Sequence, residues 1–217
     1  MKRQRDHETR ANVTATDTDT DELTEERETG RLEAFSDGVF AIAITLLILQ
    51  INVPLHSSQL FHDILHTWPS FLAYALSFLV ILVMWINHHT VFRLITRIDR
   101  RFMMINGVLL MLITFINFPT AVLADYLTSS HAGTALLFCN GTFIVTSLAF
   151  NLLWRYASFE GRLLSVHVDP ERVAAIDHAY RFGPFLYAVA FLFALVNVPL
   201  SLTVDVGLGI YYVVYGL

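Results

Sequence analysis

RLEAFSDGVFAIAITLLILQINV, Arg31 to Val53, is the stretch around which the rest of the chain is interpreted. Its polar opening contains Asp37 and runs directly into an apolar segment long enough to cross a bilayer as a helix. An ionisable side chain costs about 2.5 to 3.5 kcal/mol at the centre of a membrane span, and less near its end. Asp37 is therefore a candidate functional residue.

The composition of the whole chain indicates a membrane protein. Of its 217 residues, 55% are hydrophobic and only 15% are charged, a balance that a soluble domain rarely has. The net charge of -5 argues against binding to nucleic acid, which requires clustered Lys and Arg. The single cysteine, Cys139, lies in an apolar run and is interpreted as a small buried residue.

The first thirty residues have a different character. They are polar, rich in Thr and acidic, and they show no apolar period. Such a segment cannot bury enough surface to fold, and it lacks the apolar core of a signal peptide. We expect residues 1–30 to form a disordered cytoplasmic tail and residues 31–217 to form one all-α transmembrane domain.

Spanning helices are expected wherever about 20 mostly apolar residues follow one another. Four such segments are clear, and a fifth apolar run after residue 182 is divided at Pro199, because proline and nearby polar residues mark a turn. Six spans are the favoured number and five the alternative. The expected spans are Phe35–Val53, Trp68–Thr90, Phe102–Ala124, Ala132–Trp154, Gly183–Val198 and Leu200–Leu217.

The basic residues predict the orientation of these spans. All 14 Lys and Arg residues precede the first span, lie between the second and third, or lie between the fourth and fifth. The intervening loops have none. By the positive-inside rule the amino terminus is cytoplasmic and, with six spans, so is the carboxyl terminus.

The first span has two kinds of position. Ile42, Leu46 and Leu49 form one apolar stripe at helical spacing, with Thr45 beside it, whereas Asp37 points to another side. Without a resemblance to a known family, an ordinary lipid or helix contact would be the preferred interpretation of the stripe. Asp37 could equally be a carboxylate that stabilises the start of the helix.

The second span ends in Trp-Ile-Asn-His-His, Trp85 to His89, at a depth similar to that of Asp37. The two polar ends could meet, since imidazole, amide and indole groups can all donate a hydrogen bond to a carboxylate. These side chains could instead anchor the protein at the membrane interface, or the histidines could bind metal. The remaining histidines are scattered, which makes a metalloenzyme the weaker hypothesis. Interhelical hydrogen bonds are expected from Asn106, Asn117, Asn140 and Asn151.

Arg31 to Leu49, R-L-E-A-F-S-D-G-V-F-A-I-A-I-T-L-L-I-L, closely resembles the first-span signature of the transmembrane protein 175 family of potassium channels, in its prokaryotic single-repeat branch. The match centres on R-x-x-x-F-S-D. It extends to the W-x-N-H-H end of the second span, the length and the topology, whereas the last spans match only in general character.

This resemblance implies a homotetramer in which the first span of each subunit lines a central cation pathway. The implied pore residues are Ile42, which would form the main constriction, Leu46 and Leu49, with Thr45 in a selectivity-related position. The implied structural network consists of Arg31, Phe35, Ser36, Asp37, Trp85, Asn87 and His88.

The sequence thus predicts a passive, potassium-preferring channel in the cytoplasmic membrane of a prokaryote, without enzymatic activity, cofactor or bound metal. The permeant ion is K⁺, other monovalent cations being possible, and the partners are identical subunits and lipid. No T-V-G-Y-G filter is present, so a hydrophobic ring that gates by dewetting is expected instead. The alternative is a secondary transporter, although no span carries a central chain of carboxylates or lysines for ion coupling.

Overall fold

A computed structural model of the chain describes residues 27–51, 59–166 and 168–215. Most of the expected tail therefore lies outside the described residues. Residues 27–30, which we assigned to the tail, instead form the first turn of a helix. In chain order the elements are the first helix (Arg27–Gln50), which ends in the 3-10 turn η1 (Leu47–Gln50), α2 (Leu60–His66), α3 (Trp68–Phe92), α4 (Arg100–Phe115), α5 (Asn117–Tyr126), α6 (Ala132–Ser158), the 3-10 turn η2 (Phe159–Gly161), α7 (Pro170–Ala194) and α8 (Val198–Tyr215).

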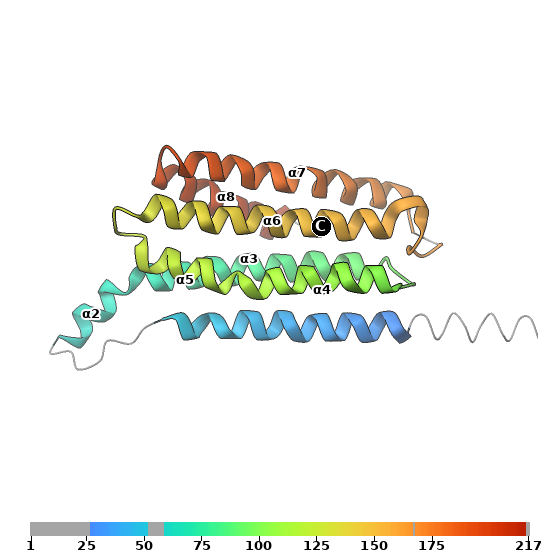
Figure 1. Cartoon of the computed structure of the whole chain (residues 1–217), viewed down its shortest axis with the longest axis horizontal. Coiled ribbons are helices and arrows are strands. Elements are labelled where there is room, and N and C mark those ends of the chain that lie inside the picture. The colour runs from blue at the N-terminus through green and yellow to red at the C-terminus, as the bar shows by residue number, and fades with distance from the viewer. Residues whose placement is uncertain (1–26, 52–58, 167, 216–217) are drawn as a thin grey trace, which may run out of the picture.

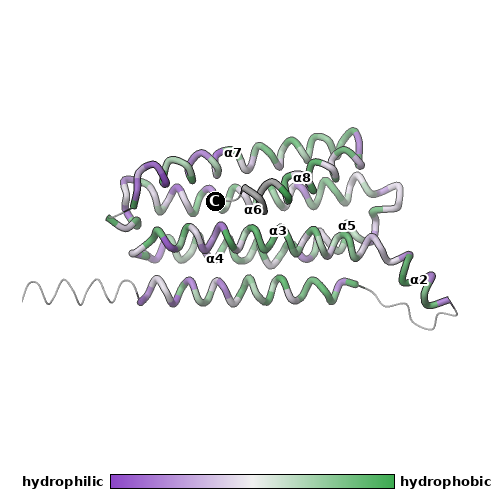
Figure 2. Tube along the Cα trace, turned by 180° about the vertical axis from the view of Figure 1, so that it is seen from behind, coloured by the Kyte–Doolittle hydropathy of each residue, from purple (hydrophilic) through white to green (hydrophobic). Residues whose placement is uncertain are grey.

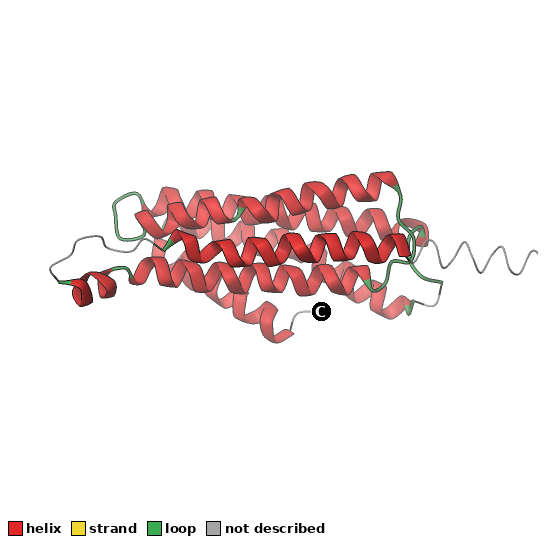
Figure 3. Ribbon diagram, turned by 90° about the horizontal axis from the view of Figure 1, so that it is seen from below, coloured by secondary structure: helices red, strands yellow, loops and turns green. Residues whose placement is uncertain are grey.

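The long helices lie side by side in an elongated bundle (Figures 1 and 3). The first helix forms one edge, next to α3 and α4, and α7 forms the opposite edge (Figure 1). Between these edges α4 packs on α6, α3 on α5 and α8, and α7 on α6 and α8. The short α2 extends beyond the end of the bundle at which α3 begins (Figure 1).

Among the described residues, four helices are long and apolar enough to cross a membrane: Arg27–Gln50, Trp68–Phe92, Arg100–Tyr126 and Ala132–Gly161. They confirm the first four expected segments. The third is interrupted after Phe115, where α4 passes into α5. Pro119 explains this break, because it has no N–H to donate to the Phe115 carbonyl and its ring crowds that carbonyl.

The expected start of the fifth helix at Gly183 is wrong, because α7 already begins at Pro170, within the polar segment that precedes Gly183. Asp169 caps this helix by accepting a hydrogen bond from the Glu171 backbone N–H at 2.9 Å. Pro170 occupies the first turn, where a missing N–H costs nothing. The new helical turns bury Ile176, which is 1% exposed, so capping and one apolar face outweigh the local polarity.

The turn expected at Pro199 lies a few residues earlier. α7 ends at Ala194 and α8 begins at Val198, so Pro199 falls in the first turn of α8. The Asn197 side chain accepts a hydrogen bond from the Leu200 backbone N–H at 3.0 Å and starts the helix.

A second proline is accommodated inside α7. Pro184 cannot donate to the carbonyl of Tyr180, four residues earlier. The side-chain amide of Asn151, on α6, donates to that carbonyl at 2.9 Å instead. The interhelical hydrogen bond expected from Asn151 is confirmed, and it repairs the hydrogen bonding of a neighbouring helix.

Polarity is distributed as in a membrane protein. Ser36, His88, Asn106 and Asn140 are completely buried, whereas many large apolar side chains on the long helices are exposed. Figure 2 shows the hydrophilic residues of the first helix and of α7 gathered at the same end of the bundle. An apolar outside and hydrogen-bonded polar residues inside suit a lipid environment.

At this polar end Asp99 joins two loops. Its carboxylate accepts hydrogen bonds from the Phe102 backbone at 2.7 Å and from the Tyr156 hydroxyl at 2.5 Å, and it pairs with Arg162 at 3.3 Å. Burial raises the pKa of the Asp99 carboxyl, but these contacts outweigh it and lower the pKa below its ordinary value. The carboxylate therefore stays charged and holds the α3–α4 and α6–α7 connections together.

Candidate functional site: the first helix and its anchor

The first helix has one face that packs into the bundle. Ser36, Phe40, Ala43 and Leu47 are at most 1% exposed, and their spacing of four, three and four residues places them on one side of a helix. The first helix therefore contributes to the core along most of its length.

Its other face is exposed within the chain. Ile42, Leu46 and Leu49 are 58%, 45% and 74% exposed. Thr45 is exposed beside them, and its hydroxyl donates to the Ile42 carbonyl at 3.0 Å. The stripe expected from periodicity is thus continuous, and no other helix in the described part of the chain covers it.

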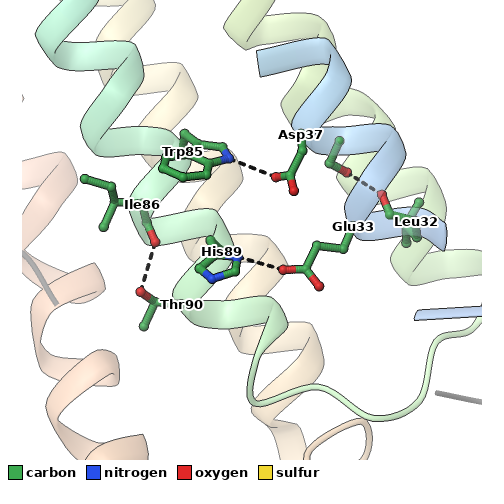
Figure 4. Close-up of polar contacts among 8 residues, drawn as sticks. Leu32, Glu33, Asp37, Trp85, Ile86, His89 and Thr90 are labelled. Atoms are coloured by element: carbon green, nitrogen blue, oxygen red, sulfur yellow. Dashed lines mark hydrogen bonds and ion pairs between the residues drawn. The ribbon is translucent and has the colours of Figure 1, made fainter. Parts of the chain in front are cut away.

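Two carboxylates fix the start of the first helix to α3 (Figure 4). The Trp85 indole N–H donates to Asp37 Oδ1 at 2.8 Å. One turn earlier on the first helix, Glu33 Oε1 lies 2.8 Å from His89 Nδ1. The Trp85 and His89 rings stack at a centroid distance of 5.9 Å, so the two contacts form a ladder between the helices.

A second, fully buried chain of hydrogen bonds lies beside this ladder. The Asn106 amide, from α4, donates to Ser36 Oγ at 2.9 Å, and its carbonyl oxygen lies 2.9 Å from His88 Nε2. The Ser36 hydroxyl donates back to the Leu32 carbonyl at 2.8 Å. The first helix, α3 and α4 therefore meet through polar atoms that are sealed from solvent.

Aromatic rings cover the buried hydrogen bonds around His88. The His88 ring lies between Phe92, at a centroid distance of 4.3 Å, and Phe40, at 5.2 Å. Hydrogen bonds in such an apolar surrounding are strong when satisfied, and costly to break. The arrangement is suited to holding the first helix in one position against α3 and α4.

The structure does not bring every expected network residue to this anchor. Arg31 and Phe35 are exposed on the other side of the helix. The Asn87 backbone carbonyl accepts a hydrogen bond from Tyr180 at 3.4 Å, but in the described part of the chain no hydrogen bond joins the Asn87 side chain to Asp37. The anchor within one chain rests on Ser36, Asp37, Trp85 and His88, with Glu33, His89 and Asn106.

The spacing could have revealed the additional members. Glu33 precedes Asp37 by four residues and His89 follows Trp85 by four, so each pair shares a helix face. The first helix and α3 are antiparallel, so a contact between Asp37 and Trp85 also places Glu33 next to His89.

The interhelical hydrogen bond expected from Asn140 is confirmed, but sequence reasoning missed the carboxylate of Asp205, with which Asn140 forms a second polar cluster between α6 and α8. With its amide nitrogen turned toward α8, Asn140 donates to both carboxylate oxygens of Asp205 at 3.1 Å, and its oxygen faces Ser201 Oγ at 3.1 Å. Asp205 also lines a cavity of about 70 Å³ between α3, α5, α6, α7 and α8. An acidic residue in an apolar run was the available signal.

Comparisons with known proteins agree with the signature of the first helix. A family model described as endosomal/lysosomal potassium channel TMEM175 matches residues 31–116. A potassium channel of Chamaesiphon minutus is 50% identical over 195 residues, which are 88% of this chain and 96% of that protein. A potassium channel of Streptomyces collinus is 42% identical over 190 residues, 85% of this chain and 91% of that protein.

A solved structure shares the fold. The crystal structure of a lysosomal potassium-selective channel TMEM175 homolog from Chamaesiphon minutus aligns with a TM-score of 0.81 and 47% sequence identity. The alignment covers 88% of this chain and 99% of that one. Most of the chain therefore has a counterpart of known architecture.

Proposed function

The chain belongs to the TMEM175 family of ion channels, and from this premise we propose that it forms a passive, potassium-preferring cation channel. The pore lies on the axis of a homotetramer and is lined by the first helix of each subunit. The single observation that carries this proposal is the exposed stripe of that helix, which faces away from the anchored core.

Small residues beside the stripe support close approach of neighbouring copies. Gly38 and Ala41 are exposed on the same face, and a side chain added at Gly38 would meet nothing within 4 Å. Small residues on a membrane helix allow another backbone to come near. Four first helices can therefore converge while the bulkier Ile42, Leu46 and Leu49 point toward the axis.

A ring of apolar side chains can control ion flow without a specific ion-binding group. Such a constriction repels water when narrow and conducts once it is wide enough to hydrate. Ile42 forms the main constriction in this proposal, and Thr45 adds the polar oxygen nearest to it. The preference for K⁺ over Na⁺ is accordingly modest.

The backbone of α8 supports a mechanism other than a carbonyl filter. The string most similar to a filter motif, T-V-D-V-G-L-G at residues 203–209, is helical. Carbonyls of a helix are used within the helix, whereas a filter needs rings of free carbonyls.

We further propose that α7 and α8 also cross the membrane, which gives six spans. The apolar second half of α7 follows a polar first half with Arg172 and Arg181, and α8 contributes an apolar helix from Val198 to Ile210. The positive-inside rule then places both termini in the cytoplasm. The cytoplasmic membrane of a prokaryote is the proposed location, and lipid covers the outer helices.

The test is a reversal-potential measurement on the purified protein in planar bilayers with unequal mixtures of KCl and NaCl. The expected result is single-channel current that reverses closer to the K⁺ equilibrium potential than to that of Na⁺. Protein-free bilayers provide the control. Flux that saturates with concentration, or that requires a proton or sodium gradient, would identify a secondary transporter and overturn the proposal.

A further inference from the structure

Two histidines of the short helix α2 face each other across one helical turn. His62 and His66 are four residues apart, and their Nε2 atoms lie 3.1 Å from each other. The ring centroids are 4.3 Å apart. Both side chains are exposed, so ions in solution can reach the two nitrogens.

The distance between the two Nε2 atoms is close to the distance between two ligand atoms of a tetrahedral metal ion. Zn²⁺ binds imidazole nitrogen at about 2.0 to 2.1 Å, which places two nitrogens of a tetrahedral site about 3.3 Å apart. A movement of a few tenths of an ångström would therefore admit the ion. In its absence, one Nε2–H can donate to the other Nε2, which keeps the rings in position.

The carboxylate of Asp63 orients His62, one of the two possible metal ligands. Asp63 Oδ1 lies 3.5 Å from Nδ1 of His62, on the side of the ring away from His66. A carboxylate at this place favours the tautomer with its proton on Nδ1 and leaves the Nε2 lone pair available. Asp63 also adds negative charge near an incoming cation.

We propose that His62 and His66 form a binding site for a divalent transition metal of the Zn²⁺ class, on a surface separate from the exposed stripe of the first helix. Imidazole ligands favour Zn²⁺, Ni²⁺ and Cu²⁺ over Mg²⁺ and Ca²⁺. In the described part of the chain no group of three His, Cys, Asp or Glu side chains could hold a metal. Water therefore occupies the remaining coordination positions, and the ion exchanges readily.

The experiment is a calorimetric titration of ZnCl₂ into the full-length protein, stripped of metal with chelator and kept in detergent. We expect a saturable site that is weakened at least tenfold in His62→Gln and in His66→Gln. His131→Gln is the matched control, because His131 is another exposed histidine, at the start of α6. Its isotherm should equal that of the unchanged protein, and MgCl₂ should not compete.

Co²⁺ provides a spectroscopic readout of the same site. Its visible absorption bands report imidazole coordination and should be absent from the double variant His62→Gln/His66→Gln. An isotherm that is the same in this double variant and in the unchanged protein would overturn the proposal.

A chemical measurement covers the case in which a variant does not fold. Acylation of histidines in the unchanged protein, mapped by mass spectrometry, should be slowed by Zn²⁺ at His62 and His66 and not at His131. Equal reactivity at His62 and His66 with and without Zn²⁺ would overturn the proposal without any substitution.

Discussion

Ile42 is a large apolar residue that the chain itself leaves uncovered, at 58% exposure. We predict that Ile42→Ala raises single-channel conductance, because a smaller side chain widens the hydrophobic ring and lets it hydrate. The free energy of unfolding of the subunit should change by less than about 0.5 kcal/mol, as for other exposed sites. Single-channel recording and thermal unfolding in detergent provide the two measurements.

The control for this substitution is Leu152→Ala on α6, where the side chain has a similar exposure of 56% but does not lie on the first helix. Its conductance should be unchanged. Equal currents from Ile42→Ala and the unchanged protein would remove Ile42 from the pore.

Asp37 differs from the stripe that follows it, because its carboxylate is hydrogen-bonded to α3 whereas the stripe is exposed. We predict that Asp37→Asn lowers the yield and thermal stability of the assembled protein, because a charged acceptor of the Trp85 N–H becomes neutral. Hydrogen bonds to charged groups contribute about 1.5 to 3 kcal/mol and neutral ones about 1, so a loss of about 1 kcal/mol is expected.

Glu28→Gln serves as control for the Asp37 variant, since Glu28 is an exposed carboxylate in the first turn of the same helix. It should leave the thermal stability unchanged. A stable Asp37→Asn assembly with altered K⁺ over Na⁺ preference would instead place Asp37 in the ion pathway.

Some contacts of the anchor residues could be predicted from the sequence and others could not. The depth of Asp37 and Trp85 in their helices was enough to suggest that they meet, and they do, at 2.8 Å. Asn106 was expected to make an interhelical hydrogen bond, but its partners, Ser36 and His88, depend on how α4 is rotated. Helix rotation follows from packing around the whole side chain, which periodicity does not specify.

At the scale of elements, the contact between α6 and α7 depends on a proline. We predict that Asn151→Leu destabilises the protein by about 1 kcal/mol, because the part-buried Tyr180 carbonyl loses the hydrogen bond that the Asn151 amide donates. Thermal unfolding of the purified protein measures the loss.

A second substitution separates this cause from a general packing defect. Pro184→Ala supplies the missing backbone N–H, so Asn151→Leu should cost less in a Pro184→Ala background than in the unchanged protein. Equal costs in both backgrounds would show that the Asn151 amide does not act through the Tyr180 carbonyl.

The boundaries of the elements were less predictable than their existence. The first four apolar segments were found because a bilayer sets their length. The start of α7 was missed because Asp169 and Pro170 form a helix start within a polar segment, and mean polarity does not detect a cap. The turn before Pro199 was placed too late, because proline is favourable in a first turn as well as after a last one.

On the scale of the whole molecule, the exposed stripe should lie near its counterparts in other copies. We predict that Leu49→Cys in a Cys139→Ala background forms disulfide-linked dimers of the chain under mild oxidation. Leu152→Cys in the same background should not. Non-reducing gels detect the dimers, and the mass of the native complex should correspond to four chains.

Absence of cross-linking at Leu49 together with a monomeric native mass would contradict the tetramer. The number of subunits could be proposed only through the resemblance of the first helix to known channels. A single chain shows which face is uncovered, whereas symmetry is a property of several chains.

The first helix is hydrogen-bonded to its neighbours more extensively near its start than near its end, and this affects how it can move. Among the described residues, the side-chain contacts near its start come from Thr29, Glu33, Ser36 and Asp37, while Gln50 donates to the Asn117 carbonyl near the far end. Because more side-chain hydrogen bonds hold the start of the helix than its far end, a tilt of the helix displaces the far end most. Leu49 lies about 10 Å further from the start of the helix than Ile42. A small tilt therefore displaces Leu49 more than Ile42, so that among the three stripe residues the proposed constriction at Ile42 would move least.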